Sequence, residues 1–188
     1  MINNNNIITK TDDIYIRWQN IRSKLRPKQR EPKGIWNIWL IMAGRGFGKT
    51  LSGTYCIIDK ILENKKQNIA IIGPTWKHVK NIMVEGRSGI LNNFPHKIEY
   101  FSTKGILKYG NTTCYLFSAE SYNSLRGHEF GWAWIDELGS CSYSEEIFDQ
   151  ITMCLRQQDS KMIITTTPCD IPILHYINSN KKTHITSG

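Results

Sequence analysis

Residues 43–50 read Ala43-Gly44-Arg45-Gly46-Phe47-Gly48-Lys49-Thr50, a glycine-rich stretch that decides the fold of this chain. An apolar run over residues 36–42 precedes it, and residues 51–64, with apolar side chains at helical spacing, follow it. A strand, a glycine-rich turn and then Gly-Lys-Thr opening a helix is the order of elements in a phosphate-binding P-loop. We therefore predict that the backbone N–H groups of this turn surround a phosphate anion.

The residue types in this stretch suit a nucleotide with Mg²⁺. Lys49 can reach the β- and γ-phosphates, and Thr50 can offer its hydroxyl to the magnesium ion. The usual pattern begins with glycine, and here Ala43 stands at that position. Alanine is acceptable if the position continues the strand with a negative φ. The alternative is an ordinary glycine-rich turn that leads into a helix and leaves Lys49 in solvent.

A second motif supplies the carboxylates that such a site needs. Residues 132–137 read Trp-Ala-Trp-Ile-Asp-Glu, an apolar strand that ends in two acids. Ligands of α/β proteins bind at the carboxyl ends of the strands. We therefore predict that Asp136 holds Mg²⁺ and that Glu137 polarises the attacking water. The alternative is a strand followed by an acidic turn without a chemical role.

A third motif, Thr165-Thr166-Thr167-Pro168, ends another predicted strand, residues 161–165. Its hydroxyls would lie beside the γ-phosphate, where they could sense hydrolysis and couple it to movement. The alternative is that β-branched residues favour a strand and proline stops it.

Composition indicates one globular domain of a reduced compartment. The chain has 188 residues, with 24 Lys and Arg against 16 Asp and Glu, a net charge of +8. This excess favours polyanionic partners such as DNA or RNA, although solubility alone would also explain it. The five cysteines are scattered and form no CxxC pair, which is typical of reduced thiols. There is no signal peptide and no membrane-spanning run, so we expect a cytoplasmic protein.

The order of the remaining elements predicts an α/β fold with a mostly parallel central sheet, helices on its flanks and an antiparallel strand addition. Residues 1–25 are expected to form a disordered tail (1–11) and a short helix (12–25), and residues 26–188 the P-loop domain. Further strands are predicted at 68–72, 97–101, 105–109, 112–118 and 183–186, with a hairpin turn at Gly110-Asn111. Further helices are predicted at 76–85, capped by Thr75, and at 88–94, 144–156 and 171–179, with 121–130 irregular.

Taken together, these motifs are similar to a known family. The chain resembles the ATPase domain of bacteriophage large terminase subunits, including those of prophages and gene-transfer agents. The resemblance covers roughly residue 26 to the end and is carried by residues 39–50, Gly73-Pro74-Thr75, residues 116–120, residues 124–127, residues 134–137 and residues 165–168. It implies a P-loop ATPase of the additional-strand, catalytic-glutamate type that drives double-stranded DNA into a procapsid. It also implies a ring of subunits that works with a portal protein and a small terminase subunit.

The resemblance also implies roles for single residues. Lys49 and Thr50 would be the Walker A residues, with Ala43, Gly44, Gly46, Phe47 and Gly48 completing the nucleotide loop. Asp136 and Glu137 would be the Walker B pair. Arg45 resembles the P-loop arginine of packaging motors, and Arg126 resembles the arginine that reaches a neighbouring subunit's nucleotide. Gln29 resembles the adenine-contacting glutamine, and Thr165 to Thr167 resemble the coupling motif.

The sequence departs from the family at its end. A large terminase normally continues into a nuclease domain with clustered acidic residues, whereas this chain stops at Gly188. We therefore expect a motor domain without nuclease activity: a truncated reading frame, half of a split protein or a decaying prophage gene.

Three other functions compete with this interpretation. A helicase-like ATPase would need further motor motifs and a second lobe. A small-molecule kinase would need an arginine-rich lid and has less use for Glu137. A remnant that binds nucleotide or DNA without packaging is the third, and the presence of every expected polar residue argues for intact chemistry instead.

Overall fold

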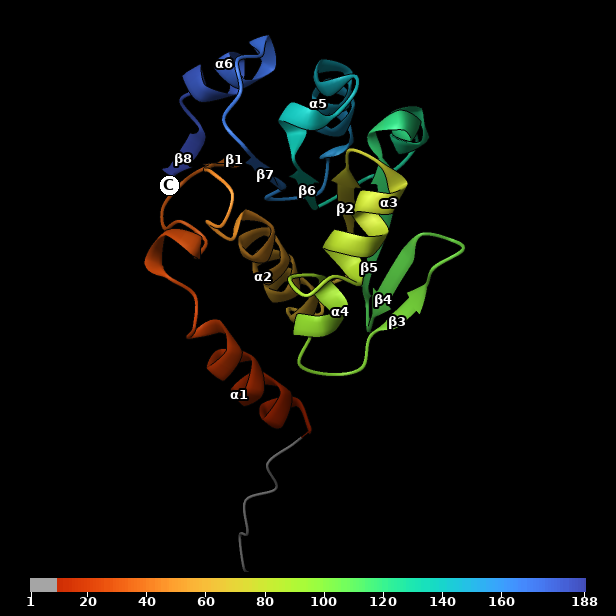
Figure 1. The fold of residues 1–188 in the computed structure, drawn as a ribbon. Helices are drawn as coiled ribbons and strands as arrows, with labels where there is room; N and C mark the ends of the chain where they lie inside the picture. The colour runs from red at the N-terminus through yellow and green to blue at the C-terminus, as the bar shows by residue number, and fades with distance from the viewer. Residues whose placement is uncertain (1–9) are drawn as a thin grey trace, which may run out of the picture.

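The computed structural model describes residues 10–188 and shows an α/β fold built on one sheet of eight strands (Figure 1). The strands lie in the order β3-β4-β5-β2-β6-β7-β1-β8. They are β1 (Ile38–Met42), β2 (Gln67–Gly73), β3 (Glu99–Phe101), β4 (Ile106–Tyr109), β5 (Thr112–Ser118), β6 (Trp132–Asp136), β7 (Lys161–Thr166) and β8 (Thr183–Ser187). The predicted α/β class is confirmed.

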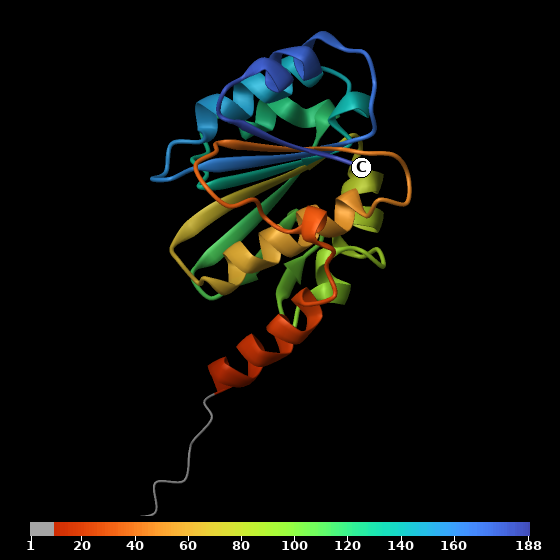
Figure 2. The same cartoon turned by 90° about the vertical axis from the view of Figure 1, so that its left-hand side faces the viewer.

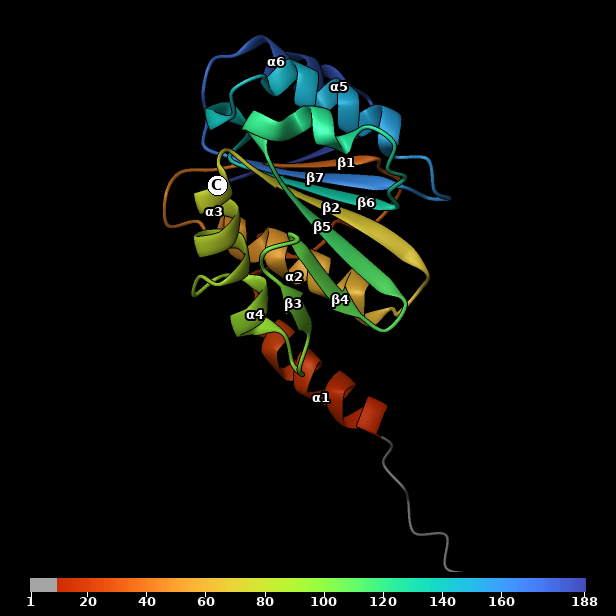
Figure 3. The same cartoon turned by 90° about the vertical axis from the view of Figure 1, so that its right-hand side faces the viewer.

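Six neighbouring strands pair in parallel, and two further strands are added through antiparallel pairing, as the sequence predicts. β5, β2, β6, β7, β1 and β8 form the parallel part, and β3 and β4 extend it as an antiparallel pair next to β5. The predicted turn at Gly110-Asn111 joins β4 to β5, with Gly110 at φ 55°. Figure 3 shows β3 and β4 on the side of the molecule that carries α4.

Helices cover both faces of the sheet (Figure 2). One face packs against α2 (Lys49–Leu62) and α4 (Ile90–Asn93), and the other packs against α5 (Ser144–Cys154) and α6 (Pro172–Ser179). Alternate residues of β1 point to opposite faces, so that Trp39 joins the α2 core and Leu40 joins the α5 core. Among the described residues, no helix is both long and apolar enough to cross a membrane.

The N-terminal helix α1 (Lys10–Arg22) is fastened to α2. Trp18 is buried, and its indole N–H donates to Asp59 Oδ1 at 2.6 Å, while Arg22 pairs with Asp59 Oδ2 at 3.2 Å. The helix begins earlier than predicted, so that residues 10 and 11 of the expected tail are helical. Residues 1–9 of that tail lie outside the described residues.

The segment after β2 differs from its prediction. Thr75 caps it as expected, accepting from the His78 N–H at 3.2 Å. The predicted regular helix 76–85 is instead a single turn, α3 (Trp76–His78), that continues as a π-helix over Val79–Val84. The Glu85 N–H accordingly donates to Lys80 O at 2.8 Å, five residues back. Residues 121–130, predicted as irregular, begin within 3₁₀ turns over Ala119–Leu125.

Gly53 allows α2 to lie close to the sheet. A Cβ atom at this position would overlap the buried indole of Trp134 on β6. We expect Gly53→Ala to lower the free energy of unfolding by about 1–3 kcal/mol through overpacking, against a gain of about 1 kcal/mol from helix propensity. Urea unfolding measures the change. In a Trp134→Phe background the same substitution should cost less; an equal cost in both backgrounds would show that the indole is not the obstacle.

Candidate nucleotide site

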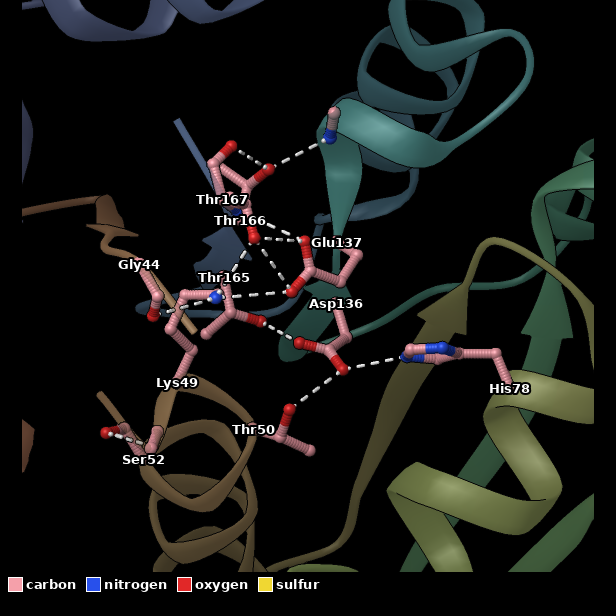
Figure 4. A network of polar contacts seen from close by, with 12 residues as sticks. Gly44, Lys49, Thr50, Ser52, His78, Asp136, Glu137, Thr165, Thr166 and Thr167 are labelled. Carbon is pink, nitrogen blue, oxygen red and sulfur yellow. Dashed lines mark hydrogen bonds and ion pairs between the residues drawn. The ribbon is translucent and has the colours of Figure 1, made fainter. Parts of the chain in front are cut away.

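The three predicted motifs meet at the carboxyl ends of β1, β7 and β6 (Figure 4). The P-loop joins β1 to α2, the threonine motif ends β7, and Asp136 ends β6. Because β7 lies between β1 and β6, the sheet order brings the three strand ends together. This is the edge where α/β proteins bind ligands.

The backbone of the P-loop explains its residue types. Ala43 is buried, its N–H donates to Thr166 O at 3.2 Å, and its φ is not positive. It therefore continues the strand, as predicted, and alanine is acceptable there. Gly46 and Gly48 have φ of 84° and 86°, a conformation that favours glycine. Gly44 to Gly46 are exposed, which leaves the turn open to an anion.

Lys49 is held inside the site. The residue is 6 % exposed, and its ammonium contacts Glu137 Oε1 at 3.3 Å, Thr167 Oγ1 at 3.2 Å and Gly44 O at 3.4 Å. The alternative in which Lys49 points into solvent is therefore wrong. The side chain lies between the P-loop and the acid of the second motif.

Asp136 is completely buried and fully hydrogen-bonded. Its Oδ1 accepts from Thr165 Oγ1 at 2.6 Å, and its Oδ2 accepts from Thr50 Oγ1 at 3.2 Å. The indole N–H of Trp134 donates to Thr165 Oγ1 at 2.9 Å, which fixes the hydroxyl that holds the carboxylate. The carboxylate is thus oriented by its own strand and by the neighbouring strand.

The oxygens of Thr50 and Asp136 fit a magnesium ion. Both are hard donors that meet at one point, and Mg²⁺ is usually bound by one or two carboxylates together with substrate phosphates and water. No group of three His, Cys, Asp or Glu side chains able to hold a metal occurs within residues 10–188. A single carboxylate and a hydroxyl would leave the other positions around such an ion to phosphate oxygens and water.

Glu137 points away from Asp136 because of its backbone. Its φ is 53°, a left-handed conformation that is uncommon outside glycine and clusters at functional sites. The Glu137 N–H donates to Thr165 O at 2.6 Å, and its Oε2 accepts from the Thr167 N–H and hydroxyl, each at 3.1 Å. The two adjacent acids therefore face different partners, Thr50 for Asp136 and Lys49 for Glu137.

The threonine motif touches both acids. Thr165 holds Asp136, Thr167 bridges Glu137 and Lys49, and Thr166 accepts from the Gly139 N–H at 3.0 Å. All three predicted residues thus lie in the site. Their role in coupling stays a prediction.

Cys141 is a thiol beside the site, with Sγ 3.5 Å from Glu137 O. Burial, together with the Asp136 and Glu137 carboxylates, raises the pKa of this thiol to about 12. It is therefore protonated at neutral pH and is not available as a nucleophile.

Gln29 lies beneath the P-loop. The residue is buried, and its Nε2 donates to Phe47 O at 2.9 Å. Its Oε1 accepts from Arg26 N at 3.0 Å and Arg26 Nε at 3.3 Å, and the Arg26 guanidinium lies 5.2 Å from the Phe47 ring centroid. Gln29 and Arg26 therefore brace the loop. Contact of Gln29 with adenine stays a prediction.

The two predicted arginines lie outside this cluster. Arg45 is exposed and forms no hydrogen bond or ion pair with residues 10–188. Arg126 is exposed and donates from Nε to Gln150 Oε1 on α5 at 3.2 Å. Arg126 forms no ion pair with Glu120 or Glu129 in the part of the chain that the structure describes.

One site residue escaped the sequence analysis. His78 lies 2.9 Å from Asp136 Oδ2 through its Nε2 atom. Its position just after β2 could have drawn attention, because β2 pairs with β6 and the two carboxyl ends are neighbours. That pairing is a property of the strand order, which no motif in the sequence indicates.

Several solved structures of phage packaging proteins are similar to this fold. The large terminase of a thermophilic bacteriophage matches with a TM-score of 0.65 and 14% identity, over 91% of this chain and 44% of that chain. The large terminase ATPase domain of Thermus phage P74-26 matches with a TM-score of 0.63 and 14% identity, over 84% and 80%. The N-terminal domain of the DNA packaging ATPase of bacteriophage phi29 matches with a TM-score of 0.61 and 10% identity, over 81% and 90%.

At these identities the likeness concerns the fold, and the chain spans less than half of the thermophilic phage's large terminase. A search of curated protein sequences gave no match. A sequence profile described as terminase large subunit, T4likevirus-type, N-terminal, matches residues 40–170, which include all three motifs and well over half of the chain. The chain therefore belongs to the family of T4likevirus-type terminase large subunits, of which it represents the N-terminal part.

Proposed function

We propose that this chain is an ATP-hydrolysing motor domain that powers the movement of double-stranded DNA into a procapsid. The observation that carries the proposal is the meeting of Lys49 with Glu137 and of Thr50 with Asp136 at the P-loop. Family membership supports it. Structures of the thermophilic phage's large terminase in complex with ADP and with ATP-gamma-S add support from a protein of the same fold.

The chain's own residues divide the work of such a reaction. The open P-loop turn and Lys49 would bind the phosphates, and Thr50 and Asp136 would hold Mg²⁺, whose charge offsets that of the phosphates. The Lys49 ammonium forms an ion pair with Glu137 Oε1 at 3.3 Å. When Lys49 turns to a phosphate, Glu137 loses this partner and is left as a free carboxylate, still oriented by Thr167, that can accept a proton from water.

Thr165 to Thr167 are suited to transmit the state of the site. They contact Asp136, Glu137 and Lys49, and Thr166 also binds the turn after β6 through the Gly139 N–H. A change in the partners of Glu137 would therefore reach β7 directly. We assign the coupling role to this motif on that basis.

The partners follow from the family and the charge. We propose that the domain acts on double-stranded DNA in the bacterial cytoplasm, assembles as a ring with other copies, and has a portal protein and a small terminase subunit as partners. The net charge of +8 suits a polyanionic track.

ATP with magnesium should stabilise the folded protein. At about a hundredfold excess over Kd, binding adds about 2.7 kcal/mol to the free energy of unfolding. A rise of the melting temperature in the parent protein, measured by calorimetry, should be absent in Lys49→Ala. Lys77→Ala, which removes an exposed lysine on α3, is the matched control and should respond like the parent. A parent protein whose melting temperature does not change with ATP would contradict the proposal.

A further inference from the structure

We propose that His78 is a positioning residue that holds the Asp136 carboxylate while no nucleotide is bound and releases it when magnesium and nucleotide bind. The π-helical segment that follows His78 would then move with occupancy of the site. This inference rests on the proposed function, because it takes Asp136 as a magnesium ligand.

The first observation is the burial of Asp136. Its side chain is 0 % exposed, and a buried carboxylate is costly unless it is paired and hydrogen-bonded. Thr165 and Thr50 supply neutral donors. Across residues 10–188, His78 is the one basic side chain within ion-pair distance of this carboxylate, at 2.9 Å. His78 therefore supports the buried carboxylate when no cation is present.

The second observation is the oxygen that His78 uses. Oδ1 of Asp136 accepts a hydrogen bond from Thr165, whereas Oδ2 accepts from both Thr50 and His78. Thr50 and Asp136 are the residues that would hold magnesium, so the ion would also use Oδ2. An N–H group directed at that oxygen presents its positive end to the same place. His78 and a divalent cation therefore compete for one atom.

The third observation is the segment to which His78 belongs. It is the last residue of α3, immediately before the π-helix Val79–Val84, and π-helical turns are rare and frequent at functional sites. The segment packs on the end of β2: a Cβ at Gly73 would lie 2.9 Å from Val79 Cγ2 and 3.1 Å from His78 Cδ2. Because His78 and Val79 pack closely on the end of β2, a displacement of His78 from Asp136 would disturb the packing of this segment.

Trp76 offers a natural probe of such a shift. It lies two residues before His78, is 38 % exposed, and its ring packs on Gly105, where a Cβ would lie 2.9 Å from Trp76 Cη2. Movement of α3 changes the environment of this ring. The fluorescence of Trp76 should therefore respond to occupancy of the site.

The first test measures the affinity for Mg²⁺·ADP by titration calorimetry. In His78→Ala no contact has to be broken, so Kd should fall by about tenfold, the equivalent of one hydrogen bond to a charged group. For ADP in EDTA the two proteins should have equal Kd. His78→Gln, which keeps a donor at the position of Nε2, should restore the parental value, and Lys77→Ala should not change it.

The second test measures tryptophan fluorescence during the same titration. The parent protein should change its emission on adding Mg²⁺·ADP but not ADP in EDTA. Trp76→Phe should lose the change, which assigns it to this ring, and His78→Ala should show a much smaller one. This readout does not depend on turnover.

The outcomes separate the two proposals. Suppose that the parent binds Mg²⁺·ADP but that His78→Ala binds it with unchanged or weaker affinity, or that Trp76 emission does not change on binding. The proposed role of His78 is then wrong, and the proposed function stands. If the parent binds no nucleotide at all while melting cooperatively, both are wrong. Tighter magnesium-dependent binding in His78→Ala, reversed by His78→Gln, is the result that the inference requires.

Discussion

Glu137→Gln is expected to slow ATP hydrolysis by about a hundred- to ten-thousandfold, the usual contribution of a general base. The substitution keeps the shape of the side chain and its bond from the Thr167 N–H, but it removes the carboxylate that accepts a proton. It also removes the ion pair with Lys49, so ATP binding should persist. Phosphate release gives the rate, and calorimetric titration gives the affinity.

A matched control is available on α5. Glu146 is exposed and lies in the first turn of that helix, so Glu146→Gln changes the net charge equally without touching the site. Its turnover should equal that of the parent. If Glu137→Gln hydrolyses ATP as fast as Glu146→Gln does, the base lies elsewhere.

Arg126→Ala is expected to abolish the hydrolysis that appears on assembly, a loss of about a thousand- to a hundred-thousandfold. Arg126 is exposed, and the one hydrogen bond of its side chain in the described part of the chain goes to the neutral Gln150. Its charge is therefore free to meet a phosphate of a neighbouring subunit, for which the planar guanidinium is well suited. ATP affinity should remain nearly parental, because the residue lies outside the Lys49 cluster.

A mixing experiment tests whether Arg126 acts in trans. Lys49→Ala and Arg126→Ala proteins, each inactive alone, are combined under assembling conditions. A mixed interface joins an intact pocket on one subunit to an intact arginine on the other, so activity should return. Arg156→Ala, which removes an exposed arginine after α5, should be as active as the parent. A mixture that stays inactive while the parent assembles and turns over would place Arg126 in cis or in a structural role.

The sequence alone predicts the elements whose residue pattern is local. The strand before the P-loop, the helix after it and the acidic end of β6 were predicted to within two residues, because buried parallel strands are short apolar runs. The π-helix at Val79–Val84 was not predicted, since its apolar residues also suit a regular helix. The contact of Gly53 with Trp134 was also missed, because it depends on how closely α2 approaches β6.

The same limit applies to the site. The residue types of Lys49, Thr50 and Asp136 define a P-loop chemistry that motifs reveal directly. His78 lies in α3, shortly after the end of β2 and 58 residues from Asp136 in sequence, and only the pairing of β2 with β6 brings it near Asp136. The resemblance pointed to Gln29 as a site residue. The orientation of its side chain toward Phe47 O depends on Arg26, which is part of no motif.

Release of phosphate from ATP is the most direct test of the central claim that the Lys49–Glu137 site hydrolyses ATP. The purified parent protein and Lys49→Ala, prepared identically and shown to melt cooperatively, are incubated with ATP, magnesium and double-stranded DNA. The account predicts phosphate release in proportion to the parent protein and none above background from Lys49→Ala. Equal release by both proteins, or none by a folded and assembled parent, would contradict it.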